Sequence, residues 1–344
     1  KTFKPKNLII NDSKKFNLFK KKNKKINIFN NYKCFKKIFK KKIDYAMCSI
    51  SGFNGLQPTI DIIKYTNTIA IANKESIICG WNIIDKQLKK NKTQFVPIDS
   101  EHFSIWSLLN KKKENIEKVY ITASGGPFLN KKINTLKNIK PMHAINHPRW
   151  KMGKKISVDS ATMINKIFEI LEAKKIFNIS LKKLKILLHP NSYVHAIVKF
   201  SNGLTKMLIH ETSMKIPIFN SLYLNQKIDF KSKAINFHYL NNLNFKKPNK
   251  NQFPSLKIIK EFHSINDSLY ETVLVSANDE LVNLFLEEKI KFLQISKKLI
   301  KIMKLKEFKK LKSKKPSNID QIIKLNKYVR LKTRSLCVRS HNNV

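Results

Sequence analysis

Short apolar runs alternate with longer helical patterns over the first 100 residues, and this alternation constrains the fold more than any other feature. The apolar runs are NLII (7–10), YAMCSI (45–50), TIAIA (68–72) and QFVPI (94–98). Helical patterns lie between them, as in LQPTIDIIKY and ESIICGWNIIDKQL. A succession of strand, helix and strand is typical of βαβ units with a mostly parallel sheet. The first part of the chain is therefore predicted to be an α/β domain.

The pattern changes in the middle of the chain. IEKVYITAS (116–124) predicts a strand, and residues 156–177 predict one long helix. The segment 195–210 alternates apolar and polar residues on both sides of Asn202-Gly203, a dipeptide that favours a hairpin with a type I′ turn. Mixed α and β structure is expected here.

After Pro254 the pattern becomes almost wholly helical up to about residue 329. Three domains are therefore predicted, covering residues 1–95, 96–253 and 254–344. The chain of 344 residues is 42% hydrophobic, which is enough to build the cores that this division requires.

The charge is strongly basic, with 69 Lys and Arg against 23 Asp and Glu and a net charge of +46. A nucleic-acid partner would explain such a charge, but only four of the basic residues are arginines, the side chain best suited to phosphate and base edges. The lysines are also spread along the chain. The run at 14–42 is open to two interpretations: a membrane-surface helix, or the favoured one, a solvated segment between strands. We predict neither a nucleic-acid nor a membrane partner.

The four cysteines show no C-x-x-C spacing, so neither a zinc site nor a disulfide framework is indicated. No run approaches the ~20 apolar residues of a transmembrane helix, and no signal segment opens the chain. A reducing, cytoplasmic location is expected.

Two carboxylates stand almost adjacent in VPIDSEHFSIW (96–106), where Asp99 and Glu101 flank Ser100. A third carboxylate, Glu169, shares one face of a predicted helix with Asn165 and Lys166, at spacings of four and three residues. The Lys–Glu pair by itself would usually be a solvated ion pair. Three carboxylates without a Cys or His cluster form a hard oxygen ligand set, which suits Mg²⁺ or Mn²⁺ rather than zinc.

Glycine is scarce, with seven residues in the chain, and two of them are adjacent in TASGGPF (122–128) at the end of a predicted strand. Backbone N–H groups at this point, with the Ser124 hydroxyl, would form a cradle for an anion such as phosphate. A tight turn after the strand explains the same glycines, and both interpretations stay open.

Six motifs together resemble the 1-deoxy-D-xylulose 5-phosphate reductoisomerase family over nearly the whole chain. They occur in the family's order: ANKES (72–76), PIDSEH (97–102), TASGGPF (122–128), HPRWKMGKKISVDSATMINK (147–166), HPNSYVHAIV (189–198) and SANDE (276–280). The resemblance implies conversion of 1-deoxy-D-xylulose 5-phosphate to 2-C-methyl-D-erythritol 4-phosphate in non-mevalonate isoprenoid biosynthesis. It also implies NADPH, Mg²⁺ or Mn²⁺, a sugar-phosphate substrate and a homodimer.

The resemblance implies a role for individual residues. The metal ligands would be Asp99, Glu101 and Glu169, and the catalytic set would add Lys74, His147 and Trp150. The substrate would also contact Ser100, Ser124, Ser160, Asn165 and Lys166. The cofactor would lie near Asn73, Glu75, Met152 and Gly153. The loop 147–153 resembles the family's flap, whose closure excludes water.

The implied fold is α/β, with a partial Rossmann-like NADPH domain, a central α/β catalytic domain carrying the flap loop and a C-terminal helical bundle. Two departures stand out. The family's glycine-rich phosphate loop is expected to precede KPKNLIIND, so an N-terminally incomplete chain is expected. Ile167 stands where the family has glycine, and its side chain would crowd the helix start or repack it.

Two alternatives to this enzyme follow from the residues. One is a relative without catalysis that has lost its cofactor site. The other is a basic protein that binds nucleic acid or a membrane surface.

Overall fold

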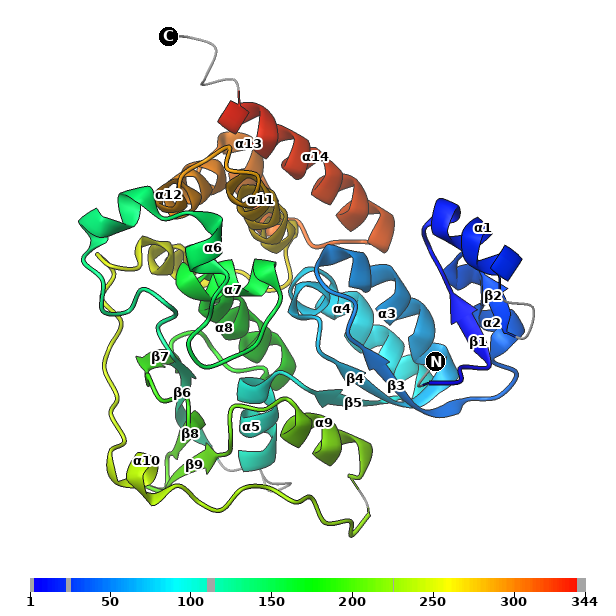
Figure 1. Ribbon diagram of the computed structural model, residues 1–344, viewed down its shortest axis with the longest axis horizontal. Coiled ribbons are helices and arrows are strands. Elements are labelled where there is room, and N and C mark those ends of the chain that lie inside the picture. Colours follow the sequence, from blue (N-terminus) through cyan, green and yellow to red (C-terminus); the bar gives the residue numbers. More distant parts are fainter. Residues whose placement is uncertain (1–2, 23–25, 110–114, 225, 339–344) are drawn as a thin grey trace.

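The N-terminal part of the chain contains two small parallel sheets. The computed structural model describes residues 3–22, 26–109, 115–224 and 226–338. β1 (Asn7–Ile9) pairs with β2 (Asn27–Phe29), and a separate parallel sheet has the order β3-β4-β5, formed by Ile43–Cys48, Thr66–Ile71 and Gln94–Pro97. The helices α3 (Leu56–Ile62) and α4 (Lys74–Asn91) lie beside this second sheet (Figure 1). The predicted α/β arrangement is confirmed.

β4 and α4 show how the sequence directs this packing. Ile69, Ala70 and Ile71 of β4 are fully buried, as expected of a strand covered on both faces. The side chain of Asn73 caps α4 by accepting a hydrogen bond from the backbone N–H of Ser76 at 2.6 Å. The strand therefore ends and the helix begins within three residues, which places Lys74 at the carboxyl edge of the sheet.

The lysine run 14–42 divides into an exposed and a packed half. It forms α1 (Ser13–Lys22), which has no buried residue among those described, and then β2 and α2 (Phe35–Ile38). Cys34 and Phe35 are buried in the core. The expectation of a solvated segment is therefore right for α1 and wrong for the second half, where aromatic side chains between the lysines pack inward.

A third sheet has the order β7-β6-β8-β9, with one parallel and two antiparallel pairings. Its strands are Leu184–Leu188, Ile116–Ala123, Val194–Phe200 and Thr205–Ile209. α5 (Ser100–Leu108) contacts β8 and β9, and α8 (Ile164–Phe177) packs against both this sheet and α4. α8 therefore lies between this sheet and the β3-β4-β5 sheet, as Figure 1 shows.

The long helix predicted over 156–177 is wrong in one respect, because two helices occupy this segment. α7 (Lys154–Ala161) ends before Met163, which adopts a left-handed conformation with φ 61°, and α8 begins at Ile164. This conformation costs a side-chain-bearing residue about 1–2 kcal/mol. Burial of Met163, which is 2% exposed, offsets that cost. Because of this break, the axis of α8 does not continue that of α7.

The hairpin between β8 and β9 is confirmed, but the predicted type I′ turn is wrong. A type I′ turn needs a positive φ at both central residues, and Gly203 has φ 88° whereas Asn202 is not among the described residues with positive φ. The N–H of Gly203 bonds to the carbonyl of Phe200 at 3.1 Å. The loop is therefore the three-residue type, with glycine in its left-handed position.

The C-terminal part is helical, as predicted. It begins with a 3₁₀ segment (Pro254–Phe262) and continues through α11 (Leu269–Leu286), α12 (Phe292–Met303), α13 (Lys306–Lys309) and α14 (Ile319–Val338). α11 contacts α4, α7, α12 and α14, so it joins the C-terminal helices to both other parts of the chain. Short segments α6 (Pro141–Ala144), α9 (Lys215–Leu222) and α10 (Phe237–Asn241) complete the described helices.

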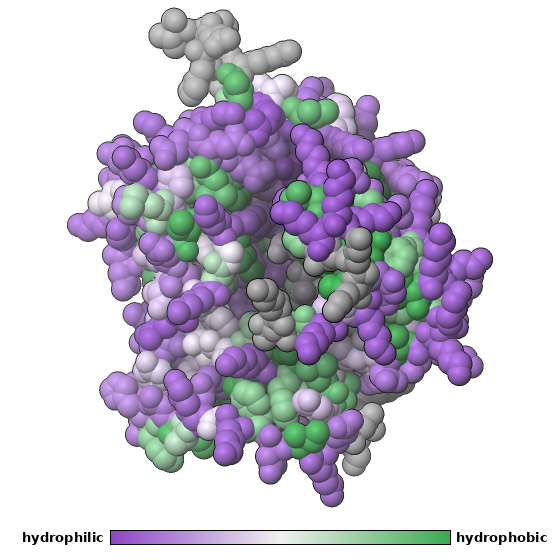
Figure 2. All heavy atoms as spheres, turned by 45° about the vertical axis from the view of Figure 1, so that its right-hand side comes forward, coloured by the Kyte–Doolittle hydropathy of each residue, from purple (hydrophilic) through white to green (hydrophobic). Residues whose placement is uncertain are grey.

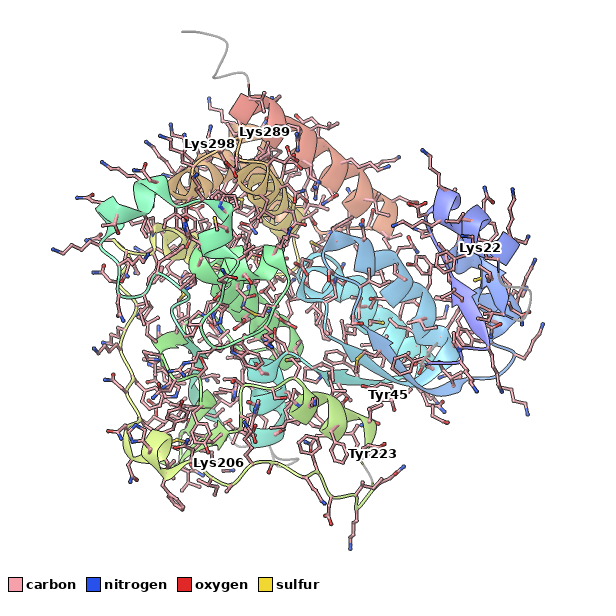
Figure 3. All side chains as sticks on the ribbon, viewed as in Figure 1. Lys22, Tyr45, Lys206, Tyr223, Lys289 and Lys298 are labelled. Atoms are coloured by element: carbon pink, nitrogen blue, oxygen red, sulfur yellow. The ribbon has the colours of Figure 1, made fainter. Side chains whose placement is uncertain are left out.

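The basic side chains are dispersed over the molecule. Lys22 and Lys206 lie far from each other and from Lys289 and Lys298, which are neighbours at the top of the view (Figure 3). A space-filling view shows one mostly hydrophilic face with apolar side chains gathered in its lower part (Figure 2). Within the described ranges, no helix is long and apolar enough to cross a membrane.

Candidate active site

Three carboxylates from two separate elements converge beside the ends of β5 and α4. Asp99 and Glu101 lie at the start of α5, directly after β5, and Glu169 lies in the second turn of α8. One oxygen from each carboxylate lies within 4.8 Å of the others. The sequence prediction of a common oxygen-ligand site stays a prediction about function, but the structure brings the three residues together.

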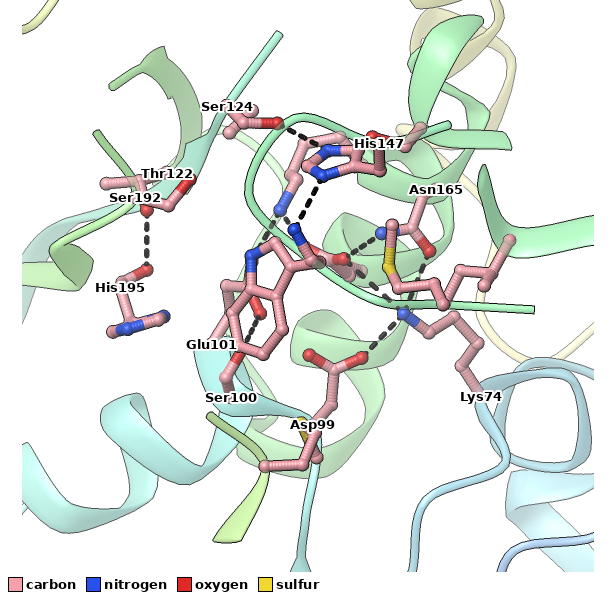
Figure 4. A pocket seen from close by; sticks show the side chains of 18 of the residues that line it. Lys74, Asp99, Ser100, Glu101, Thr122, Ser124, His147, Asn165, Ser192 and His195 are labelled. Carbon is pink, nitrogen blue, oxygen red and sulfur yellow. Dashed lines mark hydrogen bonds and ion pairs between the residues drawn. The ribbon is translucent and has the colours of Figure 1, made fainter. Parts of the chain in front are cut away.

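Two lysines form ion pairs with these carboxylates. Lys74 Nζ lies 2.5 Å from Asp99 Oδ2 and 3.4 Å from Glu169 Oε1, and it donates a hydrogen bond to Asn165 Oδ1 at 2.9 Å (Figure 4). Lys166 Nζ lies 2.7 Å from Glu101 Oε1 and 2.5 Å from Glu169 Oε2. Both lysines are buried, so each ammonium group depends on these carboxylates.

Burial and neighbouring charges shift the pKa values of the lysine and carboxylate side chains in this cluster. Burial lowers the pKa of Lys74, but the carboxylates of Asp99 and Glu169 outweigh burial and raise that pKa well above its usual value. Burial raises the pKa of Asp99, but Lys74 and His102 together outweigh burial and hold that pKa well below its usual value. Burial and the neighbouring Glu169 raise the pKa of Glu101 to about 7. Charge at Glu101 is therefore the most sensitive to a bound cation.

A second pair of buried groups, His102 and Glu172, stands behind the carboxylates. His102 Nε2 donates to the backbone carbonyl of Glu169 at 2.9 Å, which directs Nδ1 toward Glu172 Oε2 at 3.4 Å and Asp99 Oδ1 at 3.8 Å. Burial lowers the pKa of His102, but Glu172 and Asp99 outweigh it and raise the pKa to about 9. The imidazolium therefore orients Asp99 from the side away from the cavity.

A cavity of about 240 Å³ opens in front of the carboxylates. Its lining includes all nine predicted substrate-contacting residues, listed as Lys74, Ser100, Glu101, Ser124, His147, Ser160, Asn165, Lys166 and Glu169. The hydroxyls of Ser124 and Ser160, the amide of Asn165 and the ammonium of Lys166 are all hydrogen-bond donors on this wall. A group of this kind suits a phosphate.

The two glycines of TASGGPF meet a steric demand as well as lining the site. Gly126 has φ 68°, and a Cβ there would lie 3.0 Å from the Cα of Ala161 at the end of α7. Gly125 has φ 84° and lines the cavity. Ser124 Oγ accepts a hydrogen bond from the backbone N–H of Gly126 at 3.2 Å. The turn interpretation is confirmed, and the anion cradle stays a prediction that this geometry permits.

The loop 147–153 covers one side of the cavity. His147 Nδ1 accepts hydrogen bonds from the backbone N–H groups of Arg149 and Trp150, and its Nε2 lies 3.0 Å from Ser124 Oγ (Figure 4). Because Nδ1 accepts these hydrogen bonds, Nε2 carries the ring proton and donates a hydrogen bond to Ser124 Oγ. Burial and the charge of Lys166 lower the pKa of His147 to about 4. Trp150 and Met152 also line the cavity.

A larger cavity of about 810 Å³ adjoins the first one. Asn73, Glu75 and Gly153 line it, whereas Met152, the fourth predicted cofactor residue, lines the smaller cavity. Lys74 and Asn165 line both. A ligand in the larger cavity would therefore reach toward the carboxylate site past these two side chains.

Sequence reasoning missed a charged cluster on the wall of the larger cavity. Lys155 Nζ lies 2.6 Å from Glu75 Oε1, 2.8 Å from Asp159 Oδ2 and 3.0 Å from Asp279 Oδ1. These residues come from α4, α7 and α11, and a helical spacing links only Lys155 and Asp159, which are four residues apart on α7. Glu75, predicted only to contact a cofactor, is therefore also part of this junction.

Sequence reasoning also assigned no role to His102, Glu172, Ser192 or His195. Ser192 and His195 line the smaller cavity, and His195 stacks on His210 with ring centroids 3.7 Å apart. The available signals were the position of His102 directly after Glu101, and the place of Glu172 one turn beyond Glu169.

Comparisons with known proteins agree over nearly the whole chain. The model of 1-deoxy-D-xylulose 5-phosphate reductoisomerase matches residues 1–80. The model of that protein's C-terminal domain matches residues 95–177, and a second model, DXP reductoisomerase C-terminal domain, matches residues 209–332.

Curated relatives carry the same description. The 1-deoxy-D-xylulose 5-phosphate reductoisomerase of Pelagibacter ubique is 60% identical over 343 residues, covering 98% of this chain and 88% of the relative. That of Aquifex aeolicus is 35% identical over 306 residues, covering 89% of this chain and 78% of the relative.

Solved structures share the fold. The Zymomonas mobilis reductoisomerase in complex with NADPH is 28% identical, with a TM-score of 0.85 over 96% of this chain and 86% of that one. A DOX-P reductoisomerase in complex with NADPH, fosmidomycin and magnesium is 27% identical, with a TM-score of 0.90 over 98% of this chain and 87% of that one.

Proposed function

Because the chain belongs to the 1-deoxy-D-xylulose 5-phosphate reductoisomerase family, we propose that the cavity beside Asp99, Glu101 and Glu169 is its active site. The enzyme converts 1-deoxy-D-xylulose 5-phosphate to 2-C-methyl-D-erythritol 4-phosphate in isoprenoid biosynthesis, with NADPH and a divalent metal ion. The comparisons support this function and neither of the two alternatives derived from the sequence. The observation that carries the proposal for the site is the convergence of three carboxylates on a cavity lined by phosphate-binding donors.

The residues present fit a hard divalent cation. The donor set consists of carboxylate oxygens alone, and one oxygen from each of Asp99, Glu101 and Glu169 lies within 4.8 Å of the others. A bound metal ion acts as a Lewis acid that polarises a carbonyl oxygen. The ammonium groups of Lys74 and Lys166 neutralise the same carboxylates without it, so they would exchange partners when a cation binds.

Different residues of the chain contact the phosphate group and the rest of the sugar-phosphate substrate. Ser124, Ser160, Asn165 and Lys166 bind the phosphate group, and Lys74 and Ser100 contact the rest of the substrate. His147 is neutral at pH 7 because its pKa is about 4, so it orients Ser124 as a hydrogen-bond donor and adds no charge. Trp150 and Met152, which line the cavity, exclude water from it.

The larger cavity is assigned to the cofactor. Asn73, Glu75 and Gly153 line it, and Lys74 and Asn165 line both cavities, so a ligand there would lie next to the substrate. NADPH supplies the hydride, and the protein determines the approach. A steady-state assay tests the function: NADPH should be oxidised only when the sugar phosphate and Mg²⁺ or Mn²⁺ are both present. Oxidation that proceeds unchanged in a metal chelator would count against the proposed site.

The exposed edge of strand β9 supports the proposal of a homodimer. β9 is at the edge of its sheet, so its outer backbone groups have no partner strand among those described, and Leu204 and Met207 are 53% and 44% exposed beside that edge. Light scattering at several concentrations tests the assembly: a mass that stays near 40 kDa, the mass of one chain, would contradict it.

The domain division 1–95, 96–253 and 254–344 and a cytoplasmic location are proposed as well. The first boundary falls within strand β5 (Gln94–Pro97), shortly before α5, and the C-terminal helical region begins at the second. Cys34, Cys48 and Cys79 are free thiols, as a reducing compartment would keep them.

A further inference from the structure

Arg149 lies in the loop 147–153, between two residues that face the cavity. His147 is bonded to Ser124 at the end of β6, and Trp150 lines the cavity wall with its ring 6.1 Å from that of His195. Arg149 is exposed and points to the other side of the loop. The loop therefore has an inner contact through His147 and an outer one through Arg149.

The outer contact reaches two segments that are distant in the sequence. Arg149 Nε donates to the carbonyl of Pro190 at 3.3 Å, and one terminal nitrogen donates to Asn191 Oδ1 at 3.1 Å. The other terminal nitrogen donates to Tyr239 Oη at 3.4 Å, and the guanidinium carbon lies 5.9 Å from the centroid of the Tyr239 ring. One planar group thus satisfies three acceptors, which a lysine ammonium at the same place would not match in geometry.

Both segments are themselves held in place. The backbone N–H of His189 bonds to the carbonyl of Ala123 at 2.7 Å, and this fixes the 190–191 segment to the end of β6. The ring of Tyr239 packs on Tyr193, with centroids 5.8 Å apart. The backbone N–H of Tyr239 bonds to the capping side chain of Asn236 at 3.0 Å. Arg149 therefore joins the loop to fixed points of the scaffold.

We infer that Arg149 is a positioning residue that anchors the loop 147–153 and so keeps Trp150 over the substrate cavity. The effect on turnover rests on the proposed function, whereas the effect on the loop does not. A protein whose loop is in place only part of the time binds its ligand with an apparent affinity reduced by that fraction. Substrate at saturation restores the loop position, so KM should change more than kcat.

The test compares three variants with wild type in the full chain. Arg149→Ala removes the charge and the contacts, Arg149→Lys keeps the charge and loses the planar fork, and Tyr239→Phe removes one acceptor. Lys137→Ala, a lysine on the exposed 3₁₀ segment before α6, is the control for loss of one positive charge. Hydrogen exchange followed by mass spectrometry measures the amides of Arg149 and Trp150, which donate to His147 Nδ1.

We expect exchange in this loop to become roughly 5- to 10-fold faster in Arg149→Ala and Arg149→Lys, and about 2-fold faster in Tyr239→Phe. KM for the sugar phosphate should rise by a similar factor with a smaller change in kcat, and Lys137→Ala should match wild type in both. Unchanged loop exchange in Arg149→Ala overturns the inference. So does an Arg149→Lys enzyme that matches wild type, because charge alone would then suffice. If wild type itself fails to turn over the sugar phosphate, the proposed function fails, and hydrogen exchange still decides about the anchor.

Discussion

Replacing Lys74 with methionine removes one of the two ammonium groups that neutralise the three-carboxylate cluster. Lys74 Nζ lies 2.5 Å from Asp99 and 3.4 Å from Glu169, and the side chain is only 7% exposed. Methionine keeps most of the length of the side chain. The variant therefore tests charge with little change in packing.

The expected loss of unfolding free energy follows from the carboxylate charge that stays buried once Lys74 is removed. Breaking a buried ion pair by removing one partner costs about 3–5 kcal/mol, because the remaining charge is buried without compensation. Lys166 still faces Glu101 and Glu169, so we expect the lower end, about 3 kcal/mol of unfolding free energy lost in a metal chelator. A divalent cation at 100 times its Kd stabilises the folded state by about 2.7 kcal/mol. Mn²⁺ should therefore restore most of the loss.

The assay is urea unfolding with chelator and with saturating Mn²⁺. Lys155→Met is the matched control, because Lys155 is also surrounded by three carboxylates, Glu75, Asp159 and Asp279, within 3.0 Å. Among the described residues, those three acids do not meet the ligand spacing that Asp99, Glu101 and Glu169 meet. The control should lose stability that Mn²⁺ does not restore. The reasoning is refuted if Lys74→Met is as stable as wild type in chelator, or if Mn²⁺ leaves the difference unchanged.

Three other predictions follow from the site. Asp99→Asn and Glu101→Gln should each lower metal-dependent turnover by at least about 100-fold, since even partners of metal ligands are worth 10–100-fold, while circular dichroism stays that of wild type; a fully active variant would remove that residue from the ligand set. Because the pKa of His147 falls to about 4 on folding from an ordinary value near 6.5, its contribution to stability is complete above pH 6.5 and is lost as the pH falls toward 4. His147→Gln should therefore lose less stability than wild type between pH 7 and pH 5 in urea unfolding, and equal losses would contradict the assignment of a neutral imidazole. Ile167→Gly should lower the unfolding free energy by about 3–6 kcal/mol, because Ile167 is fully buried and glycine is a poor helix former; a loss below about 1 kcal/mol would mean that the helix start tolerates either residue.

Ile167, which stands where the resemblance leads us to expect glycine, illustrates what the sequence could not predict about packing. The sequence leaves open whether this side chain crowds the start of α8 or repacks it. In the structure Ile167 is 0% exposed within the main hydrophobic core, and Lys166 beside it still reaches Glu101 and Glu169. The core therefore contains the Ile167 side chain while Lys166 keeps both carboxylate contacts, and the sequence could not show this because the space around a helix start depends on the elements packed against it.

Local sequence patterns were enough to predict most of the secondary-structure elements and the type of metal ligand. Short apolar runs predict β3, β4 and β5, because strands covered on both faces are apolar throughout, and a repeat of about 3.6 residues predicts the C-terminal helices. The spacing of Asn165, Lys166 and Glu169 places them on one helical face, since that geometry is local. Carboxylates without Cys or His partners predict a hard cation, because ligand type depends on chemistry and not on the fold.

Tertiary structure alone decided which distant groups meet. The left-handed Met163 divides the expected helix and redirects α8, although nothing in the residue type predicts it. The contacts of Lys155 with Glu75 and Asp279, and the pairing of His102 with Glu172, join separate elements through packing, so no sequence interval encodes them. A carboxylate's pKa and partner depend on the distances and burial that the whole fold sets. For this reason the sequence could name the three acids and the two lysines of the site, but not that Lys74 faces Asp99 and that Lys166 faces Glu101.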